Sequence, residues 1–301
     1  MRAGDAMKQA KITAYAKINL VLDVLRKRED GYHEVAMVMQ AIDLADTIVL
    51  AEAKRNWLIT DNKHIPPNMN NLAMRAVTLM QQHYQVPPLE VTLEKRIPVA
   101  AGLAGGSTDC AAVMLGINEM YKLGLSLAEL ERLGAELGSD VPFCMGGPTA
   151  LATGRGEQIT KLPDCPDLHF VLVKPSFGVS TPKVYGNLKL AQIKEHPDVD
   201  GCVKALEANS AGGVLQNLGN LLEHSTFELQ PNVKLLKDSM MQYGCAHVLM
   251  SGSGPTVFAA FEQQADAEQY YQKIRNEYPG AILTRTVSQK QLEERVALYG
   301  S

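Results

Sequence analysis

The pattern with the clearest chemical potential is a glycine-rich run in the first half of the chain. It consists of Pro98, Val99, Ala100, Ala101, Gly102, Leu103, Ala104, Gly105, Gly106, Ser107 and Thr108. Its glycines let the backbone approach a ligand closely. The run follows a predicted strand and opens a predicted helix, whose first free amides would point at the same ligand. By its own physics, the run predicts an anion site at a helix start.

The hydroxyl groups of Ser107 and Thr108 stand at this helix start. They can cap the helix, donate to phosphate oxygens or coordinate Mg²⁺. A glycine-rich turn with a hydroxyl cap and no ligand is the alternative, because short glycine motifs often match by chance. No lysine follows the glycines as in a P-loop, and no Gly-x-Gly-x-x-Gly opens an early βαβ unit. Walker-type NTPases and dinucleotide enzymes are therefore excluded.

The elements that must position these groups are a mixture of strands and helices. Strands are predicted at 11–25, 32–43, 47–52, 57–60, 89–95, 168–173, 256–261 and 281–284. Helices are predicted from 70 or 71 to about 84, from the glycine-rich run to about 124, from a cap at 126, at 181–190, 199–208 and 233–243, and from about 265. On the first strand, Lys17 and Asn19 share one side of the pleat. Because no βαβ rhythm is sustained, the order favours an α+β fold.

The domain organisation follows from length and local composition. A chain of 301 residues suits two modest domains. A Pro/Asp-rich patch at 163–167 is the best boundary. We therefore predict an N-terminal domain at 1–162, which holds the glycine-rich run, and a C-terminal domain at 163–301.

The overall composition excludes several classes of protein. Hydrophobic residues make up 46% and charged residues 21% of the chain, as in folded globular proteins. The formal net charge of -4 and the lack of a dense Lys/Arg block disfavour a nucleic-acid partner. The five cysteines show no zinc or disulfide-exchange spacing and fit a reducing compartment. Residues 1–11 lack the apolar core of a signal peptide, and no run of about eighteen apolar residues occurs, so we predict a cytoplasmic protein without a membrane segment.

Three motifs together resemble the signatures of the GHMP kinase superfamily. They are Ala-Tyr-Ala-Lys-Ile-Asn-Leu at 14–20, the glycine-rich run with the aspartate after it, and Ser-Gly-Ser-Gly-Pro-Thr-Val-Phe at 251–258. They stand in family order and span most of the chain. Two further blocks, Asp-Gly-Tyr-His at 30–33 and Gly-Ser-Asp-Val-Pro-Phe at 138–143, resemble the branch that phosphorylates a cytidine diphosphate-linked polyol in the non-mevalonate isoprenoid pathway.

This resemblance implies a two-domain GHMP kinase-like α+β fold with the active site in the interdomain cleft. It implies direct transfer of the γ-phosphoryl group from ATP, with Mg²⁺, to the C2 hydroxyl of the polyol. The implied partner is this small-molecule substrate, with no nucleic acid and no membrane, and the chain is expected to be a monomer or a homodimer. The protein ligands of Mg²⁺ remain unassigned.

The resemblance also implies roles for individual residues. Lys17 and Asp140 match the family's catalytic pair, with Asp140 as general base and Lys17 holding it ionised near the γ-phosphate. Taken alone, a strand lysine whose charge reaches water and an aspartate that caps a turn would be the commoner readings.

The substrate side is implied in the same way. Asn19 matches the residue that contacts the polyol, and Tyr32 and His33 match the pair that holds cytosine by stacking and hydrogen bonding. Tyr185, in a short Thr-Pro-x-x-Tyr stretch, matches the second aromatic of that sandwich. A strand-edge asparagine and half-buried aromatic packing are the alternatives for these residues.

The nucleotide side adds Asn71 and Lys95, which match family positions near adenosine and the phosphates. A helix N-cap and a solvated strand end are the alternatives. Ala100, Ala101 and Ala104 stand where many family members have glycine. If any of these positions needs a positive φ, alanine would add roughly 1 kcal/mol of strain.

Overall fold

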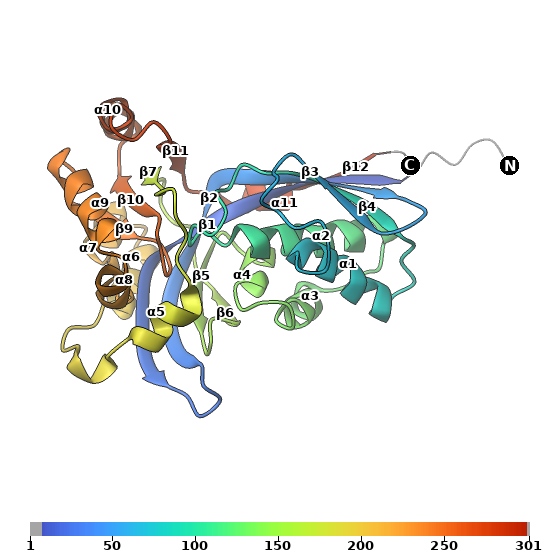
Figure 1. The fold of residues 1–301 in the computed structure, drawn as a ribbon, viewed down its shortest axis with the longest axis horizontal. Helices are drawn as coiled ribbons and strands as arrows, with labels where there is room; N and C mark the ends of the chain where they lie inside the picture. The colour runs from blue at the N-terminus through green and yellow to red at the C-terminus, as the bar shows by residue number, and fades with distance from the viewer. Residues whose placement is uncertain (1–7, 300–301) are drawn as a thin grey trace, which may run out of the picture.

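The computed structural model describes residues 8–299. Residues 1–7 and 300–301 lie outside the described residues. They include the outer ends of both predicted domains and most of the stretch at 1–11. Within the described chain, strands and helices form two lobes, each built on its own sheet (Figure 1). The predicted α+β class is confirmed.

The first sheet is built around one long hairpin of β1 and β2. Its described strands are β1 (Gln9–Lys27), β2 (His33–Glu52), β3 (Trp57–Thr60), β4 (Leu89–Glu94), β5 (Thr149–Thr153), β6 (Gln158–Lys161), β8 (Gly219–Asn220) and β12 (Val296–Tyr299). The main order is β12-β1-β2-β4-β3. Outside this order, β5 pairs with the first half of β2 and with β6, and β8 pairs with β1. Pairing is antiparallel except between β3 and β4 and between β1 and β8.

The second sheet is smaller and wholly antiparallel. Its described strands are β7 (His169–Val173), β9 (Val248–Met250), β10 (Val257–Phe261) and β11 (Ile282–Arg285), in the order β11-β7-β10-β9. The division into domains 1–162 and 163–301 stays a prediction, because β8 and β12 come from the second stretch yet pair with β1.

Helices cover both sheets. The first lobe carries α1 (Leu72–His83), α2 (Gly105–Tyr121), α3 (Leu127–Gly134), α4 (Val141–Met145) and, near the C-terminus, α11 (Gln289–Glu293). The second half supplies α5 (Thr181–Asn187), the short 3₁₀ turn η1 (Leu190–Gln192), α6 (Val199–Glu207), α7 (Ala211–Gln216), α8 (Glu223–Leu229), α9 (Pro231–Gln242) and α10 (Gln264–Ile274). Figure 1 shows α1 to α4 on one side of the β1–β2 hairpin and α6 to α10 at the other end of the molecule.

Helix α2 is the central element of the first lobe. It contacts β1, β2, α1 and α4. Its small and aliphatic residues from Cys110 to Ile117 are almost all buried, so it has no polar face along this stretch. Because neighbours enclose the helix, its first turn and the glycine-rich run before it are held in a fixed place.

The sequence-based elements differ from the structure in two ways. Several short elements were not predicted, namely β5, β6, β8, β9, β12, α4, α7, α8 and α11, and β2 joins two predicted strands. Residues 32–43 and 47–52 were expected as two strands, but β2 runs through both. The pairing of Tyr15 with Ala45 and of Ala16 with Ile42 makes two residues of β2 bulge at this point. Asp43 and Leu44 therefore mark a bulge and not a turn, because the pairing with β1 continues on both sides of them.

Candidate functional site

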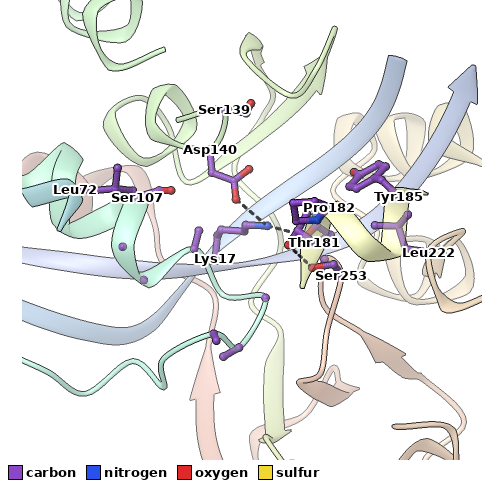
Figure 2. Close-up of a pocket in the computed structure, with 18 of the residues that line it drawn as sticks. Lys17, Leu72, Ser107, Ser139, Asp140, Thr181, Pro182, Tyr185, Leu222 and Ser253 are labelled. Atoms are coloured by element: carbon purple, nitrogen blue, oxygen red, sulfur yellow. Dashed lines mark hydrogen bonds and ion pairs between the residues drawn. The ribbon is translucent and has the colours of Figure 1, made fainter. Parts of the chain in front are cut away.

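A cleft of about 920 Å³ lies between the lobes. Side chains from β1, α5 and the 251–254 turn meet the glycine-rich run there. In Figure 2, Lys17 and Asp140 lie in the middle of the cleft, with Ser107 and Leu72 to one side and Tyr185, Pro182 and Leu222 to the other. We call these three parts of the cleft the candidate anion site, the candidate reactive centre and the aromatic end.

The glycine-rich run is fixed through its carbonyl groups. The carbonyl oxygen of Leu103 accepts from the amide of Lys17 at 3.2 Å, and that of Ala101 accepts from the amide of Thr256 at 3.3 Å. The carbonyl oxygen of Gly102 accepts from the hydroxyl of Ser251 at 3.0 Å. Gly102 also has a φ of 76°, and a Cβ there would collide with the carbonyl oxygen of Ser251. The turn at 251–254 thus packs against the glycine-rich run and holds it in place.

The first amides of α2 are left without a side-chain cap. Ala104 occupies the N-cap position in the left-handed conformation, with φ 55° and ψ 25°, and makes no capping hydrogen bond. Alanine is a poor N-cap, so the amides of Gly105 and Gly106 have no competing acceptor from that position. The helix start can therefore accept an anion.

Most residues of the run line the cleft, but two do not. Pro98 to Gly102 and Ala104 to Ser107 contribute to the lining among the described residues. Leu103 is buried in the core, and the hydroxyl of Thr108 donates to the carbonyl oxygen of Tyr15 at 2.7 Å. Leu103 and Thr108 therefore hold the run on β1 from behind.

Lys17 and Asp140 come together at the reactive centre. The Nζ of Lys17 lies 3.6 Å from an Oδ of Asp140. The Lys17 side chain is 5% exposed, whereas that of Asp140 is 31% exposed and faces the cleft. Asp140 stands at the N-cap position of α4 but makes no side-chain capping bond. The structure thus favours an open ion pair over the capping alternative for Asp140.

Asn19 orients the lysine of this pair. Its Oδ1 accepts from the Nζ of Lys17 at 2.9 Å, and its amide nitrogen lies 3.2 Å from the sulfur of Met37. Both side chains project from the same side of β1, as predicted from their spacing. A register shift of β1 directly after Asn19 lies beside the site, as bulges often do.

Lys95 also lines the cleft, but its charge is already paired. Its Nζ donates to the carboxylate of Asp109 at 2.8 Å and to that of Asp46. Asp46 also accepts the amide of Ile97 at 2.8 Å. The three charged side chains are almost fully buried, so Lys95 fixes the base of the glycine-rich run more directly than it offers a free ammonium group.

Burial and charge shift the pKa values of this cluster. Burial alone would lower the pKa of Lys95, but Asp109 and Asp46 raise it above its ordinary value. Burial raises the pKa of Asp109 to about 8, and Asp46 adds to this while Lys95 opposes it. One oxygen of Asp109 is buried without a hydrogen-bond partner, which also disfavours the ionised form.

Asn71 lines the cleft while it caps α1. Its Oδ1 accepts from the amide of Ala73 at 2.8 Å, and its amide nitrogen donates to the carbonyl oxygen of Pro66 at 3.2 Å. The capping alternative is therefore realised in the structure, and any contact with a nucleotide would come in addition to it.

The aromatic end brings together three of the predicted residues and one that was not predicted. The rings of His33 and Tyr185 lie 5.2 Å apart between centroids. Tyr32 is 54% exposed, and the guanidinium of Arg155 lies 4.9 Å from the centre of its ring. Burial and, to a smaller extent, Lys27 lower the pKa of His33, so its imidazole is neutral at physiological pH and can both donate and accept.

Several lining residues were not among the predicted site residues. They are Asp109, Ser139, Arg155, Thr181 and Ser253. The hydroxyls of Thr181 and Ser253 lie 2.7 Å apart and join α5 to the 251–254 turn. Asp109, Ser139, Thr181 and Ser253 stand within or directly beside the motifs quoted above, which could have identified them. No motif or spacing rule points to Arg155.

Two negative findings concern the described residues only. Between residues 8 and 299, no group of three or more His, Cys, Asp or Glu side chains is placed to hold a metal ion. In the same stretch, no helix is long and apolar enough to cross a membrane.

Comparison with known proteins agrees with the geometry. The family model of the GHMP kinases N terminal domain matches residues 71–148, and that of the GHMP kinases C terminal matches residues 202–280. A 4-diphosphocytidyl-2-C-methyl-D-erythritol kinase of Brevibacillus brevis is 47% identical over 285 residues, which cover 94% of this chain and 98% of that protein.

Solved structures give the same result. The crystal structure of a 4-(cytidine 5'-diphospho)-2C-methyl-D-erythritol kinase superposes with a TM-score of 0.77 at 32% identity and covers 92% of this chain and 98% of that one. A homoserine kinase from Cytophaga hutchinsonii superposes with a TM-score of 0.75 at 19% identity over 99% of both chains, which shows a shared fold. The chain belongs to the GHMP kinase family and, within it, to the 4-diphosphocytidyl-2-C-methyl-D-erythritol kinases.

Proposed function

We propose that this chain transfers the γ-phosphoryl group of ATP to the C2 hydroxyl of 4-diphosphocytidyl-2-C-methyl-D-erythritol. The products are the 2-phosphate and ADP, in a step of the non-mevalonate isoprenoid pathway. The position of the Lys17–Asp140 pair, between the uncapped start of α2 and the aromatic end, carries this proposal. A reactive centre between an anion site and an aromatic site is what in-line transfer between two bound substrates requires.

The residues divide the chemistry among them. Asp140, open to the cleft, accepts or steers the proton of the C2 hydroxyl while that oxygen attacks the γ-phosphorus. The bond between the γ-phosphorus and the bridging oxygen breaks, and ADP leaves. Lys17, held by Asn19, keeps Asp140 ionised and offsets the charge on the transferred group. The amides at the start of α2 hold the triphosphate.

Mg²⁺ would travel with the triphosphate and neutralise part of its charge. Ser107, which lines the cleft in the first turn of α2, is the hydroxyl that we assign as a protein ligand. A cytoplasmic location is supported by five free cysteines. The expectations of a monomer or homodimer and of no nucleic-acid partner stay predictions.

The experiment that tests this function is a substrate comparison. The purified enzyme is incubated with ATP, Mg²⁺ and, separately, the cytidine-linked polyol, homoserine or mevalonate, and ADP release is measured. We expect rapid ADP release with the cytidine-linked polyol alone, and a phosphomonoester at C2 by phosphorus NMR. Turnover of homoserine or mevalonate at a similar kcat/KM would instead indicate another alcohol kinase with the same fold.

A further inference from the structure

Arg155 is a charged residue of the cleft to which none of the roles above is assigned. It lies in the turn between β5 and β6, and its side chain lines the cleft. Its guanidinium lies over the ring of Tyr32 at 4.9 Å, a cation–π distance. The side chain is 33% exposed, so it is neither locked in the core nor free in solvent.

The backbone of Arg155 is held in a defined turn. Gly154 and Gly156 on either side have φ values of 70° and 105°, which side-chain-bearing residues rarely adopt. The amide of Arg155 donates to the carboxylate of Glu157 at 2.7 Å. The carbonyl oxygen of Gly154 accepts from the amide of Val35 on β2 at 2.9 Å. These hydrogen bonds therefore fix the backbone position of Arg155 on the wall of the cleft.

This position lies between the aromatic end and the reactive centre. On one side, Val35 is two residues from His33 along β2. On the other side, a Cβ built on Gly156 would lie 3.9 Å from the Cβ of Ser139, the residue before Asp140. The turn that carries Arg155 therefore adjoins both the aromatic end and the reactive centre.

The other cations of the cleft are less suited to an anion at this place. Among the described residues, the lining contains Lys17, Lys27, Lys95 and Arg155 as cationic side chains. Lys17 and Lys95 are buried against carboxylates, and Lys27 lies at the exposed end of β1. Arg155 has only a long ion pair, with 3.7 Å between its Nε and Glu157. Its planar group of donors is therefore largely free.

We propose that Arg155 binds the diphosphate group of the cytidine-linked substrate and so places the polyol against Asp140. This inference rests on the proposed function, because the diphosphate joins the cytidine, bound at Tyr32 and His33, to the polyol at the reactive centre. A guanidinium suits the task, since its donors match two phosphate oxygens at once. The field of Arg155 already acts on a nearby anion: slight burial raises the pKa of Asp30, but the Tyr32 amide, Arg28 and Arg155 together bring it below its ordinary value.

The test compares a charged and an uncharged ligand with the same base. Calorimetry measures the binding of cytidine and of CDP to the wild type and to Arg155→Met, Arg155→Lys and Arg26→Met. Arg26 is the matched control. It is a strongly exposed arginine beside Lys27 at the end of β1, and it does not line the cleft. We expect the wild type to bind CDP at least about tenfold more tightly than cytidine, because hydrogen bonds from a charged donor to phosphate oxygens are the stronger ones.

Arg155→Met should remove most of the preference for CDP and leave the affinity for cytidine within about threefold. Arg155→Lys should keep part of the preference, and Arg26→Met all of it. In kinetics, Arg155→Met should raise KM for the cytidine-linked polyol about tenfold or more, with KM for ATP unchanged. Because cytidine binding reports a folded aromatic end, loss of fold would appear as loss of both ligands.

Two results separate this inference from the proposed function. If Arg155→Met keeps the wild-type preference for CDP over cytidine, the inference is overturned while the proposed function stands. If the wild type binds neither cytidine nor CDP, the proposed function is overturned, and the inference with it.

Discussion

Two buried lysines meet the glycine-rich run from the same sheet, and they differ in the carboxylates that they face. Lys17 lies 3.6 Å from one carboxylate, that of Asp140, which is 31% exposed. Lys95 lies between Asp46 and Asp109, whose side chains are 0% and 4% exposed. Both lysines are almost fully buried themselves. The exposure of the partner therefore distinguishes the two sites, and the exposure of the lysine does not.

This difference in exposure indicates a catalytic role for one site and a structural role for the other. A general base must exchange its partner for a substrate hydroxyl, so a loosely held and accessible carboxylate is suited to it. A closed cluster of two carboxylates and one ammonium group cannot rearrange without leaving a buried charge unpaired. We therefore assign the Lys17 pair to chemistry and the Lys95 cluster to the support of the glycine-rich run.

The largest expected effect is on the closed cluster. Lys95→Met should lower the free energy of unfolding by about 3–5 kcal/mol, because the buried carboxylate of Asp46 would lose its cation and Asp109 would lose its hydrogen-bond donor. Urea denaturation measures this. Lys11→Met is the matched control, since Lys11 is exposed on β1 and should change stability by less than about 0.5 kcal/mol. A Lys95→Met protein as stable as the control would show that the cluster does not support the fold.

The open pair should show the opposite pattern. Lys17→Met should lower kcat by about 10²–10³-fold, since a preorganised charge near the transferred group is removed. Its loss of stability should be smaller than that of Lys95→Met, because the exposed Asp140 can be solvated by water. Steady-state kinetics and urea denaturation on the same preparation measure both. If only KM for ATP changed, Lys17 would be a binding residue and the contrast would fail.

The pH dependence of stability sharpens the description of the closed cluster. The pKa of Asp109 rises from 3.8 to about 8 on folding because the carboxyl is buried. Folding therefore takes up a proton between these values, and this group's contribution to stability falls as pH rises through that window. Asp109→Asn should cost about 1–2 kcal/mol near pH 7 and make the decline between pH 5 and 8 shallower. An equally steep decline in the variant would assign the pH dependence to other groups.

The smallest effect concerns the strained residue at the start of α2. Ala104 has a φ of 55°, in the region that favours glycine. Ala104→Gly should raise the free energy of unfolding by about 1 kcal/mol. Ala101→Gly is the matched control, because Ala101 is not among the residues with positive φ. This substitution should lower the free energy of unfolding. Equal effects at 101 and 104 would show that the strain at Ala104 is negligible.

Part of this site could be predicted from the sequence because short motifs fix local geometry. The parity of Lys17 and Asn19 on a strand and the helix after the glycine-rich run both follow from local pattern, and both occur in the structure. The N-cap role of Asn71 was foreseen as an alternative and is also present. The possible strain at the alanines was foreseen as well, and it falls on Ala100 and Ala104.

The rest depends on contacts between residues far apart in the chain. The pairing of β12 with β1 joins the two ends of the described chain, and nothing in the short sequence of β12 indicates its partner. The burial of Lys95 follows from Asp46, which is 49 residues away. Arg155 meets Tyr32 only because β5 continues the sheet beside β2. Local patterns contain no information about such pairings.

The most direct measurement is the turnover of Asp140→Asn. The substitution keeps the shape of the side chain and removes its ability to accept the proton, so kcat with the cytidine-linked polyol should fall by about 10²–10⁴-fold. The variant should remain folded, with a smaller loss of unfolding free energy than Lys95→Met, because Asp140 is partly exposed and Lys17 keeps its hydrogen bond to Asn19. Near wild-type turnover in a folded Asp140→Asn protein would contradict the catalytic role of the Lys17–Asp140 pair.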